Sequence, residues 1–144
     1  MSVHYQHTQP GTSMIVVLLV SALVPAAAAY TNTGSARWIG CGLALGLVIV
    51  SWLFSSLTVV VSDSELRWVL RAGLWNYRIA LGDVESSRVV RNSCMNGFGI
   101  RMRPGGRLYN VAGLDAVELQ LKSGEVRRIG TDDAARLAAA LRRN

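Results

Sequence analysis

The chain has 144 residues, with 15 Lys and Arg against nine Asp and Glu, for a formal net charge of +6. Arg37 is the one charged residue among the first 62 residues, so every other charge lies in the remainder of the chain. That remainder has roughly 80 residues, which leaves little room for a deep catalytic cleft, and it contains no histidine, which excludes the usual Ser–His–Asp and Cys–His catalytic sites.

Residues 1–13 are polar, and we expect them to form a disordered N-terminal tail. The two histidines of the chain, His4 and His7, lie here, and Pro10 and Gly11 follow them. No acidic residue lies near them in the sequence to complete a metal site, so we predict no bound metal.

Two long apolar runs follow, at Met14–Tyr30 and Trp38–Leu57. Spanning the hydrocarbon layer takes about 20 helical residues, so residues 14–57 are predicted to form a two-helix transmembrane hairpin. An alternative for the first run is a cleaved signal peptide, with an A-x-A site in Ala26–Ala29. Against this, Met1–Ser13 lacks the Lys or Arg of a signal peptide.

The distribution of arginines sets the expected orientation of the hairpin. Arg37 is alone in the connection between the runs, whereas Arg67, Arg71 and Arg78 closely follow the second run. Because positive residues concentrate on the cytoplasmic side, we predict a two-pass inner-membrane protein with both termini in the cytoplasm. The absence of Asp, Glu, Lys and Arg within the runs argues against an ion or proton pathway.

Small residues recur at a spacing of four in both runs, and such positions let helix backbones approach closely. We expect them to pack the two spans together, with homodimerisation through the second pair as an alternative. The residues are Ala22 and Ala26 in the first run, and Gly42 and Gly46 in the second. Cys41 lies in the second run and Cys94 in the polar part, so a disulfide between them is not expected.

From Leu57 onward the apolar period changes to two, which is typical of half-buried strands. Leu66, Trp68 and Leu70, for example, alternate with more polar neighbours, and turn signals such as Pro104-Gly105-Gly106 separate the segments. Regular short spacing favours an antiparallel barrel or sandwich. The predicted strands are 58–62, 65–71, 74–81, 84–91, 98–103, 107–111, 116–122 and 125–130.

The last segment, Ala134–Arg143, is rich in helix-forming residues. Thr131 can cap its N-terminus, and Leu137 and Leu141 share one face. The soluble part is therefore predicted to be a series of strands followed by one closing helix.

This layout resembles the bacterial pleckstrin-homology-like (PH-like) domain proteins that carry a short membrane hairpin ahead of the domain. The local likeness lies in Gly97-Phe98-Gly99-Ile100-Arg101, Leu108-Tyr109-Asn110-Val111-Ala112-Gly113, Asp115-Ala116-Val117-Glu118-Leu119 and Arg128-Ile129-Gly130-Thr131-Asp132. The resemblance implies that residues 58–144 form a cytoplasmic PH-like domain, with a barrel or bent sheet of about seven antiparallel strands closed by the C-terminal helix. It also implies a binding role, for lipid headgroups or protein segments. Because the residues show no usual catalytic arrangement, we expect neither an enzymatic activity nor a cofactor.

Five arginines within a short stretch are the best candidates for a binding site. Guanidinium groups suit phosphate because they present fixed donors in a fork, and a basic domain near a bilayer is attracted to anionic headgroups. The alternative is a solvated strand face without a specific ligand. The residues are Arg88, Arg91, Arg101, Arg103 and Arg107.

These observations predict a membrane-anchored, non-enzymatic binding module that presents its basic domain at the inner leaflet to a protein or an anionic lipid. The alternative is a structural subunit of a larger membrane complex, whose hairpin makes the main contacts. Nucleic acid is not expected as a partner, because the sequence has no recognised reading helix or base-stacking platform.

Overall fold

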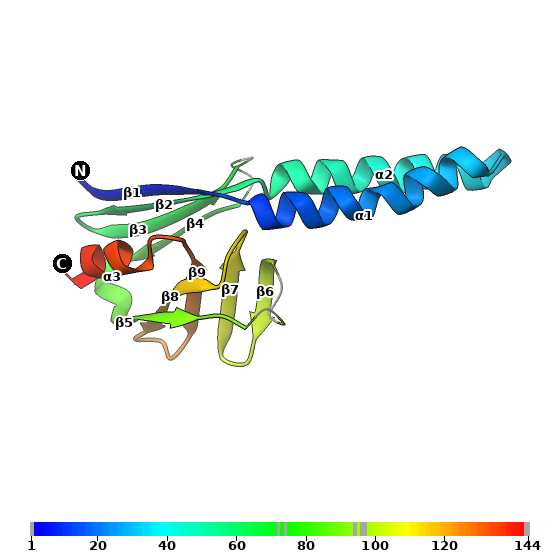
Figure 1. The fold of residues 1–144 in the computed structure, drawn as a ribbon. Helices are drawn as coiled ribbons and strands as arrows, with labels where there is room; N and C mark the ends of the chain where they lie inside the picture. Colours follow the sequence, from blue (N-terminus) through cyan, green and yellow to red (C-terminus); the bar gives the residue numbers. More distant parts are fainter. Residues whose placement is uncertain (1, 72, 74, 94, 96–97, 143–144) are drawn as a thin grey trace.

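The computed structural model describes residues 2–71, 73, 75–93, 95 and 98–142. A hairpin of two long helices extends from a β-rich domain of two packed sheets (Figure 1). The helices of the hairpin are α1 (Thr12–Thr31) and α2 (Gly34–Leu53). The first sheet has strands β1 (Val3–Pro10), β2 (Ser56–Ser62), β3 (Glu65–Leu70) and β4 (Asn76–Ala80). The second sheet has β5 (Val84–Arg91), β6 (Gly99–Arg103), β7 (Gly106–Asn110), β8 (Asp115–Leu121) and β9 (Val126–Gly130), and the short 3-10 helix η1 (Leu81–Asp83) precedes it. The chain then forms α3 (Ala134–Arg142).

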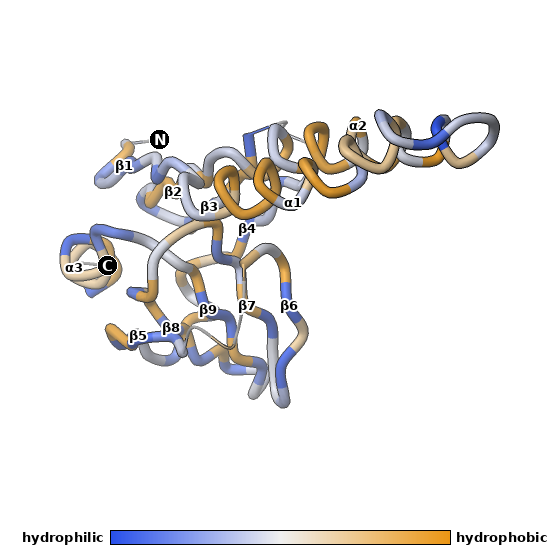
Figure 2. Tube along the Cα trace, turned by 45° about the vertical axis from the view of Figure 1, so that its right-hand side comes forward, coloured by the Kyte–Doolittle hydropathy of each residue, from blue (hydrophilic) through white to orange (hydrophobic). Residues whose placement is uncertain are grey.

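Both helices of the hairpin are 20 residues long and apolar enough to cross a membrane. Most of their apolar surface is exposed, since only 11% of the most apolar stretch of each is buried. Apolar residues run along both helices, whereas polar and apolar residues alternate along the strands (Figure 2). The second helix ends at Leu53, earlier than the predicted Leu57, because β2 begins at Ser56.

The two helices pack through fewer of the predicted small residues than expected. Ala22 and Ala29 of α1 are buried, and a Cβ on Gly40 of α2 would lie 2.7 Å from the Pro25 carbonyl oxygen and 2.9 Å from the Ala29 backbone nitrogen. Ala26 is exposed, and nothing in the described structure lies within 4 Å of a Cβ built on Gly42 or Gly46. The prediction that these three residues pack the hairpin is therefore wrong. Gly42 lies two residues beyond Gly40, about 200° around the helix, and so faces away from α1.

The N-terminal segment is a strand, so the prediction of a disordered tail is wrong for Val3–Pro10. This strand, β1, pairs antiparallel with β2, with His7 opposite Val59 and Pro10 opposite Ser56. Tyr5 is buried in the core, and the Gln9 side-chain amide donates to the Ala112 carbonyl oxygen at 2.9 Å. The segment is short and its apolar residues few, so its own sequence carries little strand signal.

Side chains of β1 also meet three aspartates. His4 contacts Asp63, His7 Nε2 lies 2.6 Å from Asp132 Oδ1, and the Tyr5 hydroxyl donates to Asp133 Oδ2 at 3.4 Å. A hydrogen bond from the backbone N–H of Ser2 is the largest cause that holds the pKa of the Asp63 carboxyl below its usual range, and the hydrogen bond with His4 is the second. Burial, together with the nearby Asp133 carboxylate, raises the pKa of Tyr5 to about 12.

The hairpin is inserted between two strands that are neighbours in the first sheet. Gly11 connects β1 to α1, and its backbone N–H donates to the Ser55 carbonyl oxygen at 2.7 Å. A Cβ at this position would clash with the Phe54 carbonyl oxygen, so only glycine fits the close approach of the two chain segments. The helices therefore continue directly from β1 and β2 (Figure 1).

All eight predicted strands are present, with ends that differ by no more than a few residues. The predicted hairpins between β6 and β7 and between β8 and β9 also form. The two packed sheets agree with the sandwich that the strand spacing predicts as one alternative, whereas the barrel alternative and the all-antiparallel pairing are wrong. The domain has nine strands in sheets of four and five, which within the described residues do not close into a barrel, and β7 pairs with β9 in parallel. The parallel pair arises because β9 lies between β7 and β8, antiparallel to β8.

The core lies between the two sheets and is closed by α3. Trp68 and Tyr109 meet edge to face with ring centroids 5.2 Å apart, and Tyr77 stacks on Trp68 at 5.7 Å. Leu137 and Ala138 of α3 are buried at the end of the domain furthest from the hairpin (Figure 1). The predicted closing helix is thus present. Cys41 is exposed, and Cys94 lies outside the described residues.

Candidate anion-binding site

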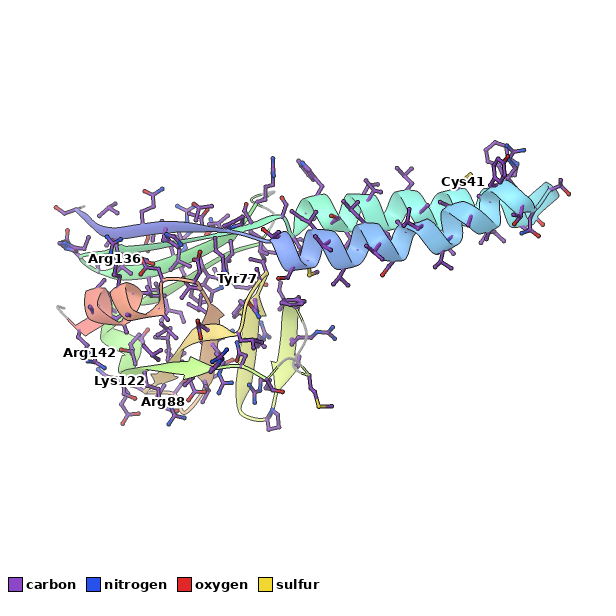
Figure 3. All side chains as sticks on the ribbon, viewed as in Figure 1. Cys41, Tyr77, Arg88, Lys122, Arg136 and Arg142 are labelled. Carbon is purple, nitrogen blue, oxygen red and sulfur yellow. The ribbon has the colours of Figure 1, made fainter. Side chains whose placement is uncertain are left out.

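A cavity of about 270 Å³ lies on the outer face of the second sheet, which points away from the first sheet. Alternate residues of adjacent strands face it, because residues at even spacing along a strand share one face. Figure 3 shows Arg88 on this side of the domain. The cavity is lined by Arg88, Arg103, Pro104, Gly106, Arg107, Glu118, Gln120, Val126 and Arg128. By strand register Arg88, Arg103, Glu118 and Arg128 share this face, whereas Arg107, next to Gly106, alternates to the other face.

Glu118 lies between two of these arginines. Strand register places it opposite Arg88 on one side and Arg128 on the other. Arg88 Nε donates to Glu118 Oε1 at 2.8 Å, and Arg128 Nε donates to Oε2 at 3.0 Å. Burial raises the pKa of the Glu118 carboxyl, but the hydrogen bonds from Arg128 and Arg88 outweigh this and hold the pKa below its usual range. The carboxylate is therefore ionised at neutral pH and orients both guanidinium groups.

Arg103 is held differently. Its Nη1 atom is buried and has no hydrogen-bond partner among the described residues. A buried donor without a partner costs about 1–3 kcal/mol, and Arg103 keeps a donor that no described residue satisfies. Arg128 is better satisfied, because its Nη1 donates to the Asn92 side-chain oxygen at 3.0 Å.

The structure brings three of the five predicted arginines to this cavity, namely Arg88, Arg103 and Arg107. Arg101 shares a strand face with Arg103, but it is exposed and its Nε donates to the Phe98 carbonyl oxygen at 3.3 Å. Arg91 is exposed opposite Asp115 at the end of β5. Neither of these two residues lines the cavity.

Sequence reasoning missed Glu118, Gln120 and Arg128. Each lies at a polar position in an alternating strand, which by itself predicts only a solvated face. The signal that joins them is cross-strand register, because Arg88, Glu118 and Arg128 lie side by side on β5, β8 and β9. That register links residues 30 positions apart for Arg88 and Glu118.

The lining of the cavity offers hydrogen-bond donors and one carboxylate that two arginines keep ionised, and none of its lining residues is a histidine, cysteine, serine or threonine. A comparison of the sequence with known protein families finds no matching family, and a comparison with curated proteins finds no similar sequence.

Proposed function

We propose that this chain is a two-pass protein of the bacterial inner membrane, whose hairpin holds a PH-like domain at the cytoplasmic surface. The domain is a non-enzymatic binding module, and its ligand is an anionic group of the phosphate or carboxylate class. The grouping of Arg88, Arg103 and Arg128 around a single carboxylate in one cavity carries the proposal, and Arg103 also has a guanidinium nitrogen without a partner among the described residues.

The exposed apolar surface of α1 and α2 supports the membrane assignment. Leaving this much apolar area in water would be costly, at about 25 cal/mol for each Å². The arginine distribution supports the orientation, because Arg37 lies at the far end of the hairpin while Arg67, Arg71 and Arg78 lie in the domain.

The order of elements supports the PH-like assignment. A series of antiparallel hairpins forms two packed sheets, and a C-terminal helix closes one end of the core. The parallel pair β7–β9 and the strand β1, which comes from before the hairpin, are departures from the pattern that the resemblance implies.

The proposal is tested with the full chain in detergent micelles, using inorganic phosphate as the probe. A ligand that binds only the folded state raises its stability in proportion to the logarithm of ligand concentration above Kd. We expect the unfolding temperature to rise in phosphate relative to chloride at equal ionic strength, and the rise to be lost in Arg103→Gln.

Arg91→Gln is the matched control, because Arg91 lies on β5, like Arg88, but is exposed and does not line the cavity. It should retain the full response to phosphate. An equal response to phosphate and chloride in the native chain, or equal losses in the two variants, would show that the arginines form only a solvated face. Native mass spectrometry of the chain released from membranes then distinguishes a retained anionic lipid from an acidic protein segment as the natural source.

A second candidate function is that of a structural subunit in a membrane complex. The observation that favours it is the outward position of Gly42 and Gly46 on α2, where small residues leave room for a further helix. This role and anion binding use different surfaces of the molecule.

A further inference from the structure

Strand β6 forms an open edge of the second sheet at the base of the hairpin. The strand order β5-β8-β9-β7-β6 leaves one edge of β6 unpaired among the described residues. This edge lies on the side of the domain from which the helices extend (Figure 1). An exposed strand edge presents unpaired backbone groups and is usually covered or protected.

The length of the helices places this edge at the level of the bilayer surface. A helix of 20 residues is about 30 Å long, which equals the thickness of the hydrocarbon layer. The hydrocarbon boundary then falls at the first turn of α1 and the last turn of α2, with a headgroup layer of about 5–7 Å beyond it. A Cβ built on Gly99 of β6 would lie 3.7 Å from Met14 Cε, so the start of β6 lies against the first turn of α1.

The side chains at this edge have the composition of a membrane-contacting surface. Outside α1 and α2, the large apolar side chains that are exposed in the described structure are Val3, Val89, Met95 and Met102. Two of these four belong to β6 and the segment before it, where Met95 is 92% and Met102 is 77% exposed. Arg101 is exposed between them in the sequence, as a partner for lipid phosphate.

The first sheet carries a comparable group at the same level. Arg71 lies over the exposed Trp52 ring with its Cζ 5.9 Å from the ring centroid, and its Nη1 donates to the Ser55 hydroxyl at 3.0 Å. Phe54 stacks on Trp75 with centroids 5.2 Å apart. Tryptophan and arginine are typical of the membrane–water interface, so the two sides of the hairpin base match in chemistry.

We propose that the β6 edge, with Met95, Arg101 and Met102, rests on the headgroup layer of the same membrane and fixes the orientation of the domain. This inference rests on the proposed membrane insertion of the hairpin but not on the anion cavity. The partner is a bilayer surface that contains anionic lipids. The contact would also cover the open edge of β6 and keep the cavity on the outer face of the second sheet at a set distance from the membrane.

Spin labelling of the full chain tests the contact. A single cysteine replaces Met102 in a chain with Cys41→Ser and Cys94→Ser, reconstituted in nanodiscs of phosphatidylcholine and phosphatidylglycerol. Power saturation compares collisions of the label with oxygen, which concentrates in lipid, and with a water-soluble nickel complex. Lys122→Cys is the matched control, because Lys122 is exposed on the turn between β8 and β9, away from the helices (Figure 3).

We expect the oxygen-to-nickel ratio at position 102 to be several-fold higher than at position 122. Adding Arg101→Glu should lower the ratio at position 102 toward the control in phosphatidylglycerol nanodiscs, and less so in phosphatidylcholine alone. A label at Leu45, in the middle of α2, reports insertion of the hairpin separately. If the oxygen-to-nickel ratio at position 102 is as low as at position 122, while the label at position 45 lies in lipid, the contact is overturned and the membrane assignment remains intact. Dipolar broadening between labels at position 102 would instead identify pairing of β6 with a second copy, and would also overturn it.

Discussion

At the scale of single residues, Glu118 is the residue that joins three strands of the second sheet through its side chain. Its carboxylate is nearly buried and accepts hydrogen bonds from both Arg88 and Arg128. The glutamate therefore keeps two guanidinium groups in place on the sheet surface, whereas Arg103 retains an unpartnered donor. The ion pairs of Glu118 thus hold Arg88 and Arg128, and Arg103 of the same cavity is held without an ion pair within the described structure.

Glu118→Gln should lower the free energy of unfolding by about 1.5–3 kcal/mol, the typical value of hydrogen bonds to a charged group. The substitution keeps the size of the side chain but removes the charge that both arginines face. Chemical denaturation followed by tryptophan fluorescence measures the change. Glu85→Gln is the control, because Glu85 is exposed on β5, and its replacement should change stability by less than about 0.5 kcal/mol.

The lowered pKa of Glu118 also predicts how the stability of the native chain, relative to Glu118→Gln, depends on pH. The pKa of Glu118 in the folded protein lies below its ordinary value of 4.5. Its contribution is therefore fully present above that value and is lost as the pH falls through the lower pKa of the folded state. The stability difference between the native chain and Glu118→Gln should be constant near neutral pH and shrink below about pH 4.5. A difference that grows on acidification would contradict the assignment.

At the scale of elements, the contact between α1 and α2 depends on Gly40 and not on the more conspicuous Gly42 and Gly46. The backbone of α1 near Pro25 and Ala29 approaches Gly40 so closely that no side chain fits without displacement. The G-x-x-x-G spacing identified a face of α2 on which helix packing is possible, but only the packed hairpin shows that α1 lies on the opposite face.

Gly40→Leu should therefore destabilise the hairpin by about 1–3 kcal/mol, the usual cost of overpacking. Gly42→Leu should leave the stability of the monomer unchanged, because nothing in the described structure lies within 4 Å of that position. Thermal unfolding in detergent micelles compares the two variants. Loss of a dimer or complex in Gly42→Leu at unchanged monomer stability would favour the structural-subunit role, and equal destabilisation by both variants would contradict the packing described.

Local patterns predicted most elements correctly. The two apolar helices, the eight strands from β2 to β9 and the closing helix each have a period that neighbouring residues define. In contrast, β1 has few apolar residues and is a strand because it pairs with β2. In this pairing His7 lies opposite Val59. A strand that depends on a partner so far along the chain leaves little trace in its own sequence.

At the scale of the whole molecule, the hairpin is an insertion in a β-hairpin. Gly11 and Ser55 are hydrogen-bonded neighbours although the entire helical hairpin separates them in sequence. A β-hairpin with a two-residue Asn-Gly loop has the geometry to connect such a pair. The β-rich domain should therefore not need the helices in order to fold.

We expect a chain that joins residues 2–11 to residues 55–144 through Asn-Gly to be soluble and to unfold cooperatively. A chain that begins at Ser55 lacks β1, exposes the edge of β2 and loses the buried Tyr5 ring, whose removal alone costs about 3–5 kcal/mol. Circular dichroism and thermal unfolding compare the two. Equal stability of both chains would show that β1 contributes nothing to the domain.

The sequence by itself determined which parts can meet lipid and which need water, because the free energy of burying apolar surface depends on composition and area and not on long-range geometry. The segregation of charge around Arg37 is therefore enough to separate the hairpin from the basic domain. Only the tertiary structure showed that β1 completes the domain from the other side of the hairpin, and that Arg88, Glu118 and Arg128 lie side by side. Both facts depend on strand register between distant segments, which local periodicity does not specify.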